Sequence, residues 1–145
     1  MSARPDALAF FTDRDLGKQF PGILAQAGLV VHRHADHFAP DCPDDVWLEA
    51  VAERKWIAIS RDARIRYKPN ELAAVIRHGA RLLIVIGKAP HSELAANFVA
   101  TIPAIVSFVA AQRAPWIGKV YRPTTEEVKD DPTCGRVELW YPQPG

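Results

Sequence analysis

The chain has 145 residues, of which 48% are hydrophobic and 24% charged, and its formal net charge is +1. This balance excludes a disordered chain, and the length suits one domain with its own core. The near-neutral charge also excludes nucleic-acid binding through a global positive field, so any such contact requires a local basic patch.

The cysteines and the N-terminal segment indicate a cytoplasmic protein. Cys42 and Cys134 are the two cysteines, and neither lies in a C-x-x-C pair or in a zinc-finger spacing. Residues 1–6 lack the apolar core of a secretion signal, and no apolar run is long enough to cross a bilayer. We therefore expect two reduced thiols and no membrane association.

The first part of the chain alternates short apolar runs with helical spacing. Three buried strands are predicted, at residues 7–12, 29–31 and 56–60. The helix between the first two ends at Gly28, and Pro43 opens a second helix, because proline is tolerated in the first turn. Residues 32–42, rich in His, Asp and Pro, are predicted to form a loop.

The alternation continues beyond the third strand. Asn70 is expected to cap a helix that ends at Gly79. Residues 81–86 are predicted to form a fourth strand. Ser92 is expected to cap a further helix, which Pro103 bends or divides.

The tail of the chain has a different pattern. Residues 117–121 and 137–141 predict two strands, linked by an acidic segment at 126–132, that form a hairpin or add an edge to the sheet. Strands that alternate with helices predict a parallel sheet covered on both faces. The expected fold class is therefore α/β, with a central, mostly parallel sheet flanked by helices and a C-terminal β-hairpin.

Acidic residues gather at one edge of this predicted sheet. Asp13 and Asp15 directly follow the first strand, and Asp62 follows the third. Asp44 and Asp45 begin the helix before the third strand, and that helix starts at the same edge. Ligands of parallel α/β sheets bind beyond the carboxyl ends of the strands. A turn or a helix cap would explain any one of these acids, so the interpretation as a ligand site depends on their joint placement.

Clustered carboxylates repel one another unless a cation neutralises them. Mg²⁺ and Mn²⁺ prefer oxygen ligands. Such ions bind a phosphodiester, lower the pKa of an attacking water and stabilise the leaving oxygen. The acid cluster is therefore compatible with a nuclease, although it does not by itself name the reaction.

Four segments carry motifs in a fixed order. Residues 11–16 read F-T-D-R-D-L, 43–48 read P-D-D-V-W-L, 56–62 read W-I-A-I-S-R-D, and 63–71 read A-R-I-R-Y-K-P-N-E. Together they resemble the D-x-[ND]-L, D-x-x-W-L, [ST]-x-D and I-R-x-x-P-x-E motifs of compact bacterial PIN-like proteins, which are related to the VapC toxins of toxin–antitoxin pairs.

The resemblance implies one PIN-like domain over residues 1–145, with a core at about 7–112 and the hairpin as an extension at about 113–145. It implies Mg²⁺- or Mn²⁺-dependent endoribonuclease activity, in which a metal-activated water cleaves RNA. The catalytic metal ligands would be Asp13, Asp44 and Asp62, with Ser60 in support. It also implies a toxin with a cognate antitoxin as partner. The apolar, aromatic tail is a candidate docking or homodimer surface, although part of the protein's own core is the preferred interpretation.

Larger PIN domains have a fourth acid late in the chain. Between residues 86 and 112 this sequence offers Glu93 alone, and Glu93 suits a helix start. Asp15 and Asp45 are the candidates to complete the site. If neither does so, we expect a site that holds one ion or is weak. The missing fourth acid also makes a non-catalytic PIN-like binding module the alternative function.

A basic segment follows the third strand and is the candidate RNA-binding region. Its cations would hold phosphates beside the acids, and Tyr67 would stack on an unpaired base. The cations are Arg61, Arg64, Arg66 and Lys68. The competing interpretation is a solvated loop whose arginines pair with the nearby aspartates.

His32, His34, Asp36 and His37 form an H-x-H-x-D-H run, which resembles the zinc motif of the metallo-β-lactamase fold. No histidine follows His91, and the βαβ alternation argues against that two-sheet fold. A zinc hydrolase is therefore kept only as a second alternative, and surface residues are the preferred interpretation of the run.

Overall fold

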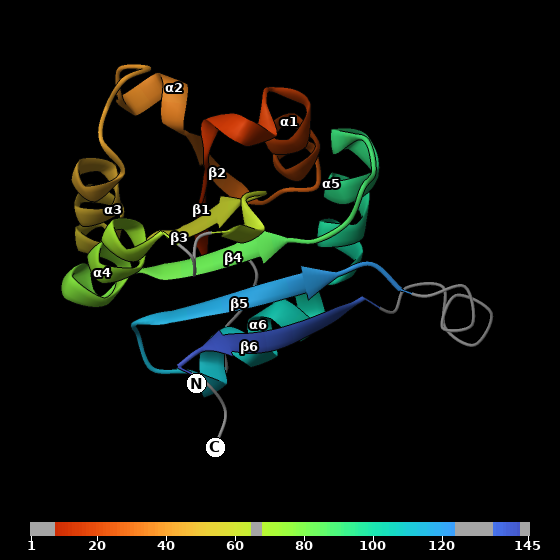
Figure 1. The fold of residues 1–145 in the computed structure, drawn as a ribbon. Coiled ribbons are helices and arrows are strands. Elements are labelled where there is room, and N and C mark those ends of the chain that lie inside the picture. Colours follow the sequence, from red (N-terminus) through yellow and green to blue (C-terminus); the bar gives the residue numbers. More distant parts are fainter. Residues whose placement is uncertain (1–7, 65–67, 124–134, 143–145) are drawn as a thin grey trace.

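The computed structural model describes residues 8–64, 68–123 and 135–142. Its strands form one six-stranded sheet in the order β2-β1-β3-β4-β5-β6 (Figure 1). The strands are β1 (Ala9–Thr12), β2 (Val30–Arg33), β3 (Ile57–Ser60), β4 (Arg81–Val85), β5 (Trp116–Tyr121) and β6 (Arg136–Tyr141). The first five pair in parallel, and β6 pairs antiparallel with β5 at the edge.

Helices connect the parallel strands and cover the sheet (Figure 1). They are α1 (Gln19–Gln26), α2 (His34–His37), α3 (Asp44–Glu53), α4 (Pro69–His78), α5 (His91–Ala100) and α6 (Ile102–Ala111), with a 3-10 turn η2 (Arg14–Leu16). This mixed architecture confirms the predicted fold class. The two tail strands satisfy both predicted outcomes, because β5 extends the parallel sheet and β6 turns back on it as a hairpin.

Two apolar cores lie on opposite faces of the sheet, because successive side chains of a strand point to opposite faces. Phe10 of β1 packs in the core covered by α1, α5 and α6, and its neighbour Phe11 packs in the core covered by α3 and α4. In β4, Leu83 packs in the same core as Phe10, and Leu82 packs in the same core as Phe11. Burial on both faces explains why the central strands read as continuous apolar runs.

Several helix boundaries differ from the sequence-based expectations. The helix before β4 begins at Pro69, with Lys68 and not Asn70 at the N-cap, because proline suits the first turn. In the same way α5 begins directly after Pro90, so the expected cap at Ser92 was wrong. As predicted, α4 ends at Gly79, which adopts the left-handed conformation.

The segment at 32–42 contains structure that the sequence did not predict. Its first two residues complete β2, and α2 follows directly. His34 starts that short helix, and its side chain is buried against Phe11, Phe38 and Trp47. These aromatic contacts are made across the fold, so the local sequence pattern could not reveal them.

Helices α5 and α6 meet at the expected break near Pro103. In the described part of the chain no single helix is long and apolar enough to span a membrane. Helices α5 and α6, which are bent by 65° relative to each other, reach the length and apolar composition of a membrane span only when the two are taken together.

The sheet has a switch point between β1 and β3. The chain leaves β1 toward β2 on one side and then crosses to β3 on the other. In open α/β sheets, ligands bind in the crevice beyond the carboxyl ends of the strands at such a point. The residues after β1 and β3 therefore lie where sheets of this kind bind their ligands.

Candidate active site

A small pocket of about 50 Å³ lies at this carboxyl edge, and we call it the acidic pocket. Its lining residues come from β1, α3, β3, β4 and the start of α4. They are Asp13, Asp44, Trp47, Leu48, Ser60, Asp62, Lys68, Glu71 and Leu82. One water needs about 10–15 Å³ of such space, so the pocket has room for a metal ion with a few waters.

Asp13 enters the pocket from the end of β1. Its backbone N–H donates to the carbonyl of Ile59 at 3.0 Å, which joins the ends of β1 and β3. Its side chain accepts from the N–H of Arg14 at 2.7 Å and so caps the 3-10 turn. This local cap fixes the carboxylate at the strand end.

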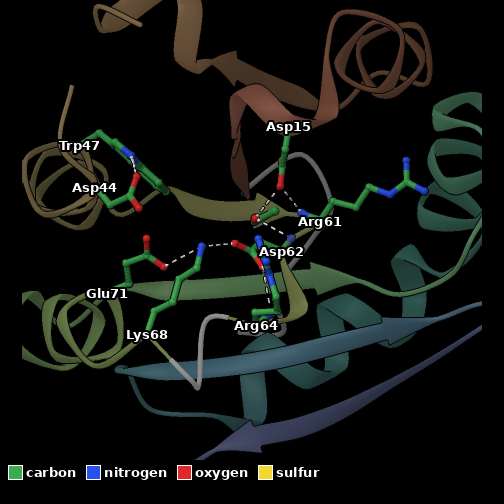
Figure 2. A network of polar contacts seen from close by, with 9 residues as sticks. Asp15, Asp44, Trp47, Arg61, Asp62, Arg64, Lys68 and Glu71 are labelled. Atoms are coloured by element: carbon green, nitrogen blue, oxygen red, sulfur yellow. Dashed lines mark hydrogen bonds and ion pairs between the residues drawn. The ribbon is translucent and has the colours of Figure 1, made fainter. Parts of the chain in front are cut away.

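Asp44 enters from the first turn of α3. Its Oδ1 accepts a hydrogen bond from Nε1 of Trp47 at 2.8 Å (Figure 2). Trp47 is 4% exposed and stacks on Phe11 with ring centroids 5.3 Å apart. The buried indole therefore orients this carboxylate toward the pocket.

Ser60, the last residue of β3, forms hydrogen bonds that hold the loop after the strand. Its hydroxyl donates to Oδ2 of Asp15 at 3.1 Å and accepts from the N–H of Asp62 at 3.1 Å. Asp15 Oδ2 also accepts from the N–H of Arg61 at 3.0 Å (Figure 2). Asp15 does not line the acidic pocket; it holds the segment that carries Asp62.

Asp62 is ion-paired in the structure. Nζ of Lys68 lies 2.5 Å from its Oδ2, and the side chain and N–H of Arg64 donate to its Oδ1 at 3.3 and 3.0 Å. Burial alone would raise the pKa of Asp62, but these hydrogen bonds outweigh it and hold the pKa below its usual value. Lys68 also lies 3.7 Å from Glu71, so its ammonium is placed between two carboxylates (Figure 2).

Two other acids of the pocket, Asp13 and Glu71, have raised pKa values. Burial, followed by the charge of Asp15, raises the pKa of Asp13 to about 6. Burial, followed by a hydrogen bond shared with Asp44, raises the pKa of Glu71 to about 7. Charge repulsion and desolvation both favour the protonated acid, so a cation at this place would relieve both groups.

Glu71 lines the acidic pocket but is not among the site residues predicted from the sequence. It lies in the first turn of α4, the helix that precedes β4, just as Asp44 lies in the first turn of the helix that precedes β3. Chain direction therefore places Glu71 at the same edge of the sheet as Asp44. The I-R-x-x-P-x-E segment ends on this residue, which was a second available signal.

Two other acids considered as the fourth carboxylate lie elsewhere. Asp45 is half exposed, and its carboxylate pairs with Arg77 and His78 at the end of α4. Glu93 pairs with Arg122 at 3.3 Å, on the α5 side of the molecule. Neither lines the acidic pocket.

The basic segment after β3 is largely engaged with the protein itself. The guanidinium of Arg61 points away from the pocket and donates to the carbonyls of Gly87 and Ala89 at 3.3 and 2.9 Å (Figure 2). Arg64 and Lys68 pair with Asp62. The other two residues predicted to bind RNA, Arg66 and Tyr67, lie outside the described residues.

The histidine run is divided between two environments. The ring of His32 stacks on Trp56 at 3.8 Å, and His37 contacts both of these rings. His34 is 2% exposed and packs against Phe11 instead. The three imidazoles do not face a common point, which removes the geometric basis of the zinc alternative.

A divalent cation fits the chemistry of the acidic pocket. Across residues 8–64, 68–123 and 135–142, no three His, Cys, Asp or Glu side chains already stand in the arrangement of a metal site. The pocket nevertheless gathers carboxylate oxygens, the donors that Mg²⁺ and Mn²⁺ prefer, and an ammonium already lies among them. The side chains that would hold such an ion are Asp13, Asp44, Asp62 and Glu71.

A family model described as a PIN like domain matches residues 8–87, which are 80 of the chain's 145 residues. The chain belongs to the PIN-like domain family. The matched segment includes every residue of the acidic pocket, so the whole candidate site lies within the PIN-like domain. No curated protein and no solved structure matches the chain significantly. PIN-like domains are typically nucleases, and this chain has a nuclease-type fold.

Proposed function

We propose that this PIN-like protein is a metal-dependent endoribonuclease that hydrolyses RNA phosphodiester bonds. The observation that carries the proposal is the acidic pocket, in which carboxylates from four separate segments meet at the switch point of the sheet. Mg²⁺ or Mn²⁺ bound there would lower the pKa of an attacking water and stabilise the leaving oxygen. The acids proposed to act are Asp13, Asp44 and Asp62, joined by Glu71.

The surrounding residues position these acids. Trp47 orients Asp44, and Ser60 links Asp15 to the backbone that carries Asp62. Such fixed side chains lower the reorganisation needed when charge develops on a phosphate. Lys68 carries the ammonium nearest to the acids, which suits contact with a phosphate oxygen.

The proposed reaction is hydrolysis by an external water. The water oxygen bonds to phosphorus, the bond from phosphorus to the 3′ oxygen breaks, and the leaving oxygen takes up a proton. Because the RNA 2′-hydroxyl is not consumed, the products carry 5′-phosphate and 3′-hydroxyl ends. The test incubates purified protein with RNA in MnCl₂ or EDTA and analyses the new ends. Cleavage that survives EDTA, or cyclic phosphate products, would refute the proposal.

A non-catalytic binding module is the second candidate function. The observation that favours it is Lys68, whose ammonium forms ion pairs with Asp62 and Glu71 and so occupies the position that a metal ion would take. In that case the protein would bind its ligand and leave RNA intact at every metal concentration. The same incubation therefore decides between the two functions.

We further propose a toxin role with a cognate antitoxin as partner, which rests on the motif resemblance alone. Induced expression in a bacterial host should then arrest growth with the native chain but not with the Asp13→Asn variant. A homodimer is an additional expected assembly, and sedimentation of the purified protein tests it. Equal growth with both chains would refute the toxin role without touching the nuclease proposal.

A further inference from the structure

A second cleft lies directly beside the acidic pocket, and we call it the basic cleft. It has a volume of about 170 Å³ and follows the carboxyl ends of β1 and β2. Its lining residues are Thr12, Asp13, Arg14, Gly17, Lys18, Arg33, His34 and Ala35. Asp13 lines both hollows, so a ligand that spans them passes over this one carboxylate.

The cations of the basic cleft differ from those of the segment after β3. Lys18 and Arg33 form no ion pair or hydrogen bond through their side chains with any part of the chain that the structure describes. Arg14 donates one N–H to the carbonyl of Pro40 at 2.8 Å, which anchors its guanidinium and leaves its other donors unused. Three cations thus face a single carboxylate, Asp13.

Two residues that line the cleft also have buried polar atoms without a hydrogen-bond partner among the described residues. Thr12 Oγ1 and His34 Nδ1 are buried, and neither has a partner among the described residues. Buried polar atoms in folded proteins are normally paired. Both atoms are shielded from solvent, so the cations would make the first contacts with an incoming ligand.

We propose that the basic cleft is a phosphate-binding subsite, which holds the RNA backbone next to the acidic pocket. Taking RNA as the ligand rests on the proposed function. Cations without protein partners suit a phosphodiester, because contact with phosphate positions a nucleic acid without reading its sequence. The cations of the segment after β3 that the structure describes are paired with protein groups. Lys18 and Arg33 are therefore more available to contact phosphate.

The test measures binding of a labelled single-stranded RNA oligonucleotide in EDTA, by fluorescence anisotropy over a range of NaCl concentrations. The variant Lys18→Gln/Arg33→Gln removes two cations of the cleft. The control Arg54→Gln/Arg113→Gln removes two exposed cations next to the amino ends of β3 and β5, so both proteins have the same net charge.

The cleft variant should bind at least about tenfold more weakly than the native chain. Its plot of log affinity against log salt should be flatter by about 1.4, since each single-strand phosphate contact contributes about 0.7. The control should behave as the native chain does. Equal affinity in both variants, or no measurable binding by the native chain, would overturn the subsite.

The result is independent of cleavage. If the Asp13→Asn variant loses cleavage while the cleft variant binds RNA normally, the nuclease proposal stands and the subsite falls. If no protein cleaves RNA and the cleft variant still binds more weakly, the subsite stands and the nuclease proposal falls.

Discussion

The ammonium of Lys68 lies 2.5 Å from Oδ2 of Asp62 and 3.7 Å from a carboxylate oxygen of Glu71. The hydrogen bond to Asp62 raises the pKa of Lys68, so the side chain stays charged. An acidic pocket with an internal cation has two states available: one neutralised by the protein, and one neutralised by a bound ion.

Replacing Lys68 should separate these two states. In the Lys68→Gln variant the acids lose their protein counter-ion, so we expect metal-free stability to fall by about 1 kcal/mol. A divalent ion no longer competes with an ammonium, so Mn²⁺ should bind more tightly and raise the melting temperature further than in the native chain. Thermal melts in EDTA and in increasing MnCl₂ measure both effects. The exposed Lys88→Gln variant is the control, and unchanged Mn²⁺ affinity in Lys68→Gln would contradict the account.

Asp13 should make metal-free stability depend on pH. Burial and then the charge of Asp15 raise its pKa from 3.8 to about 6. A raised acid pKa favours the folded, protonated form, so this stabilisation is complete below about pH 4 and is lost as the pH rises through 6.

The Asp13→Asn variant retains the cap to Arg14 and carries no charge. We expect it to be more stable than the native chain at pH 8 by on the order of 3 kcal/mol, because the pKa of Asp13 is raised from 3.8 to about 6 and each pKa unit corresponds to about 1.4 kcal/mol. The difference should vanish near pH 4. Urea unfolding in EDTA at several pH values measures it, and a pH-independent difference would show that the carboxyl is not destabilised by its surroundings.

Glu71 should act as the fourth acid. The Glu71→Gln variant removes one carboxylate from the pocket, so Mn²⁺ affinity should fall at least about tenfold at pH 8. The matched control is Glu93→Gln, whose carboxylate pairs with Arg122 outside the pocket. Isothermal titration calorimetry gives both affinities. Similar values for the two variants would exclude Glu71 from the metal site.

Ser60 should affect both stability and RNA cleavage, because it holds the loop that carries Asp62. Ser60→Ala removes the hydrogen bond to Asp15 and the acceptor for the N–H of Asp62. We expect a loss of about 1–3 kcal/mol in unfolding free energy, together with slower RNA cleavage. The control is Ser107→Ala on α6, an exposed serine that should change neither quantity. A native rate in Ser60→Ala would mean that the loop does not position Asp62.

Strand direction was sufficient to predict where Asp13 and Asp62 lie, because parallel strands end at one edge of the sheet. The same reasoning placed Asp44, which precedes the buried Trp47 by three residues and therefore shares its helix face. Glu71 follows the same rule, because it lies in the first turn of α4, which starts at this edge of the sheet.

Side-chain partners across the fold were beyond the sequence. Arg61 donates to the carbonyls of Gly87 and Ala89, and this contact depends on how the loop after β4 packs. The basic cleft was missed because Lys18 and Arg33 are separated by 15 positions and meet only after β1 and β2 pair. Such sites carry no local pattern that a sequence reading detects.

The most direct measurement compares Asp44→Asn with Asp45→Asn. These neighbours have the same chemistry, but Asp44 lines the acidic pocket, and Asp45 pairs with Arg77 and His78 outside it. In MnCl₂, RNA cleavage by Asp44→Asn should fall at least about 100-fold, since losing a metal ligand removes several kcal/mol of transition-state stabilisation. Asp45→Asn should cleave at a rate within a few-fold of the native chain. Equal rates for the two variants, or cleavage by Asp44→Asn at the native rate, would contradict the assignment of catalysis to this pocket.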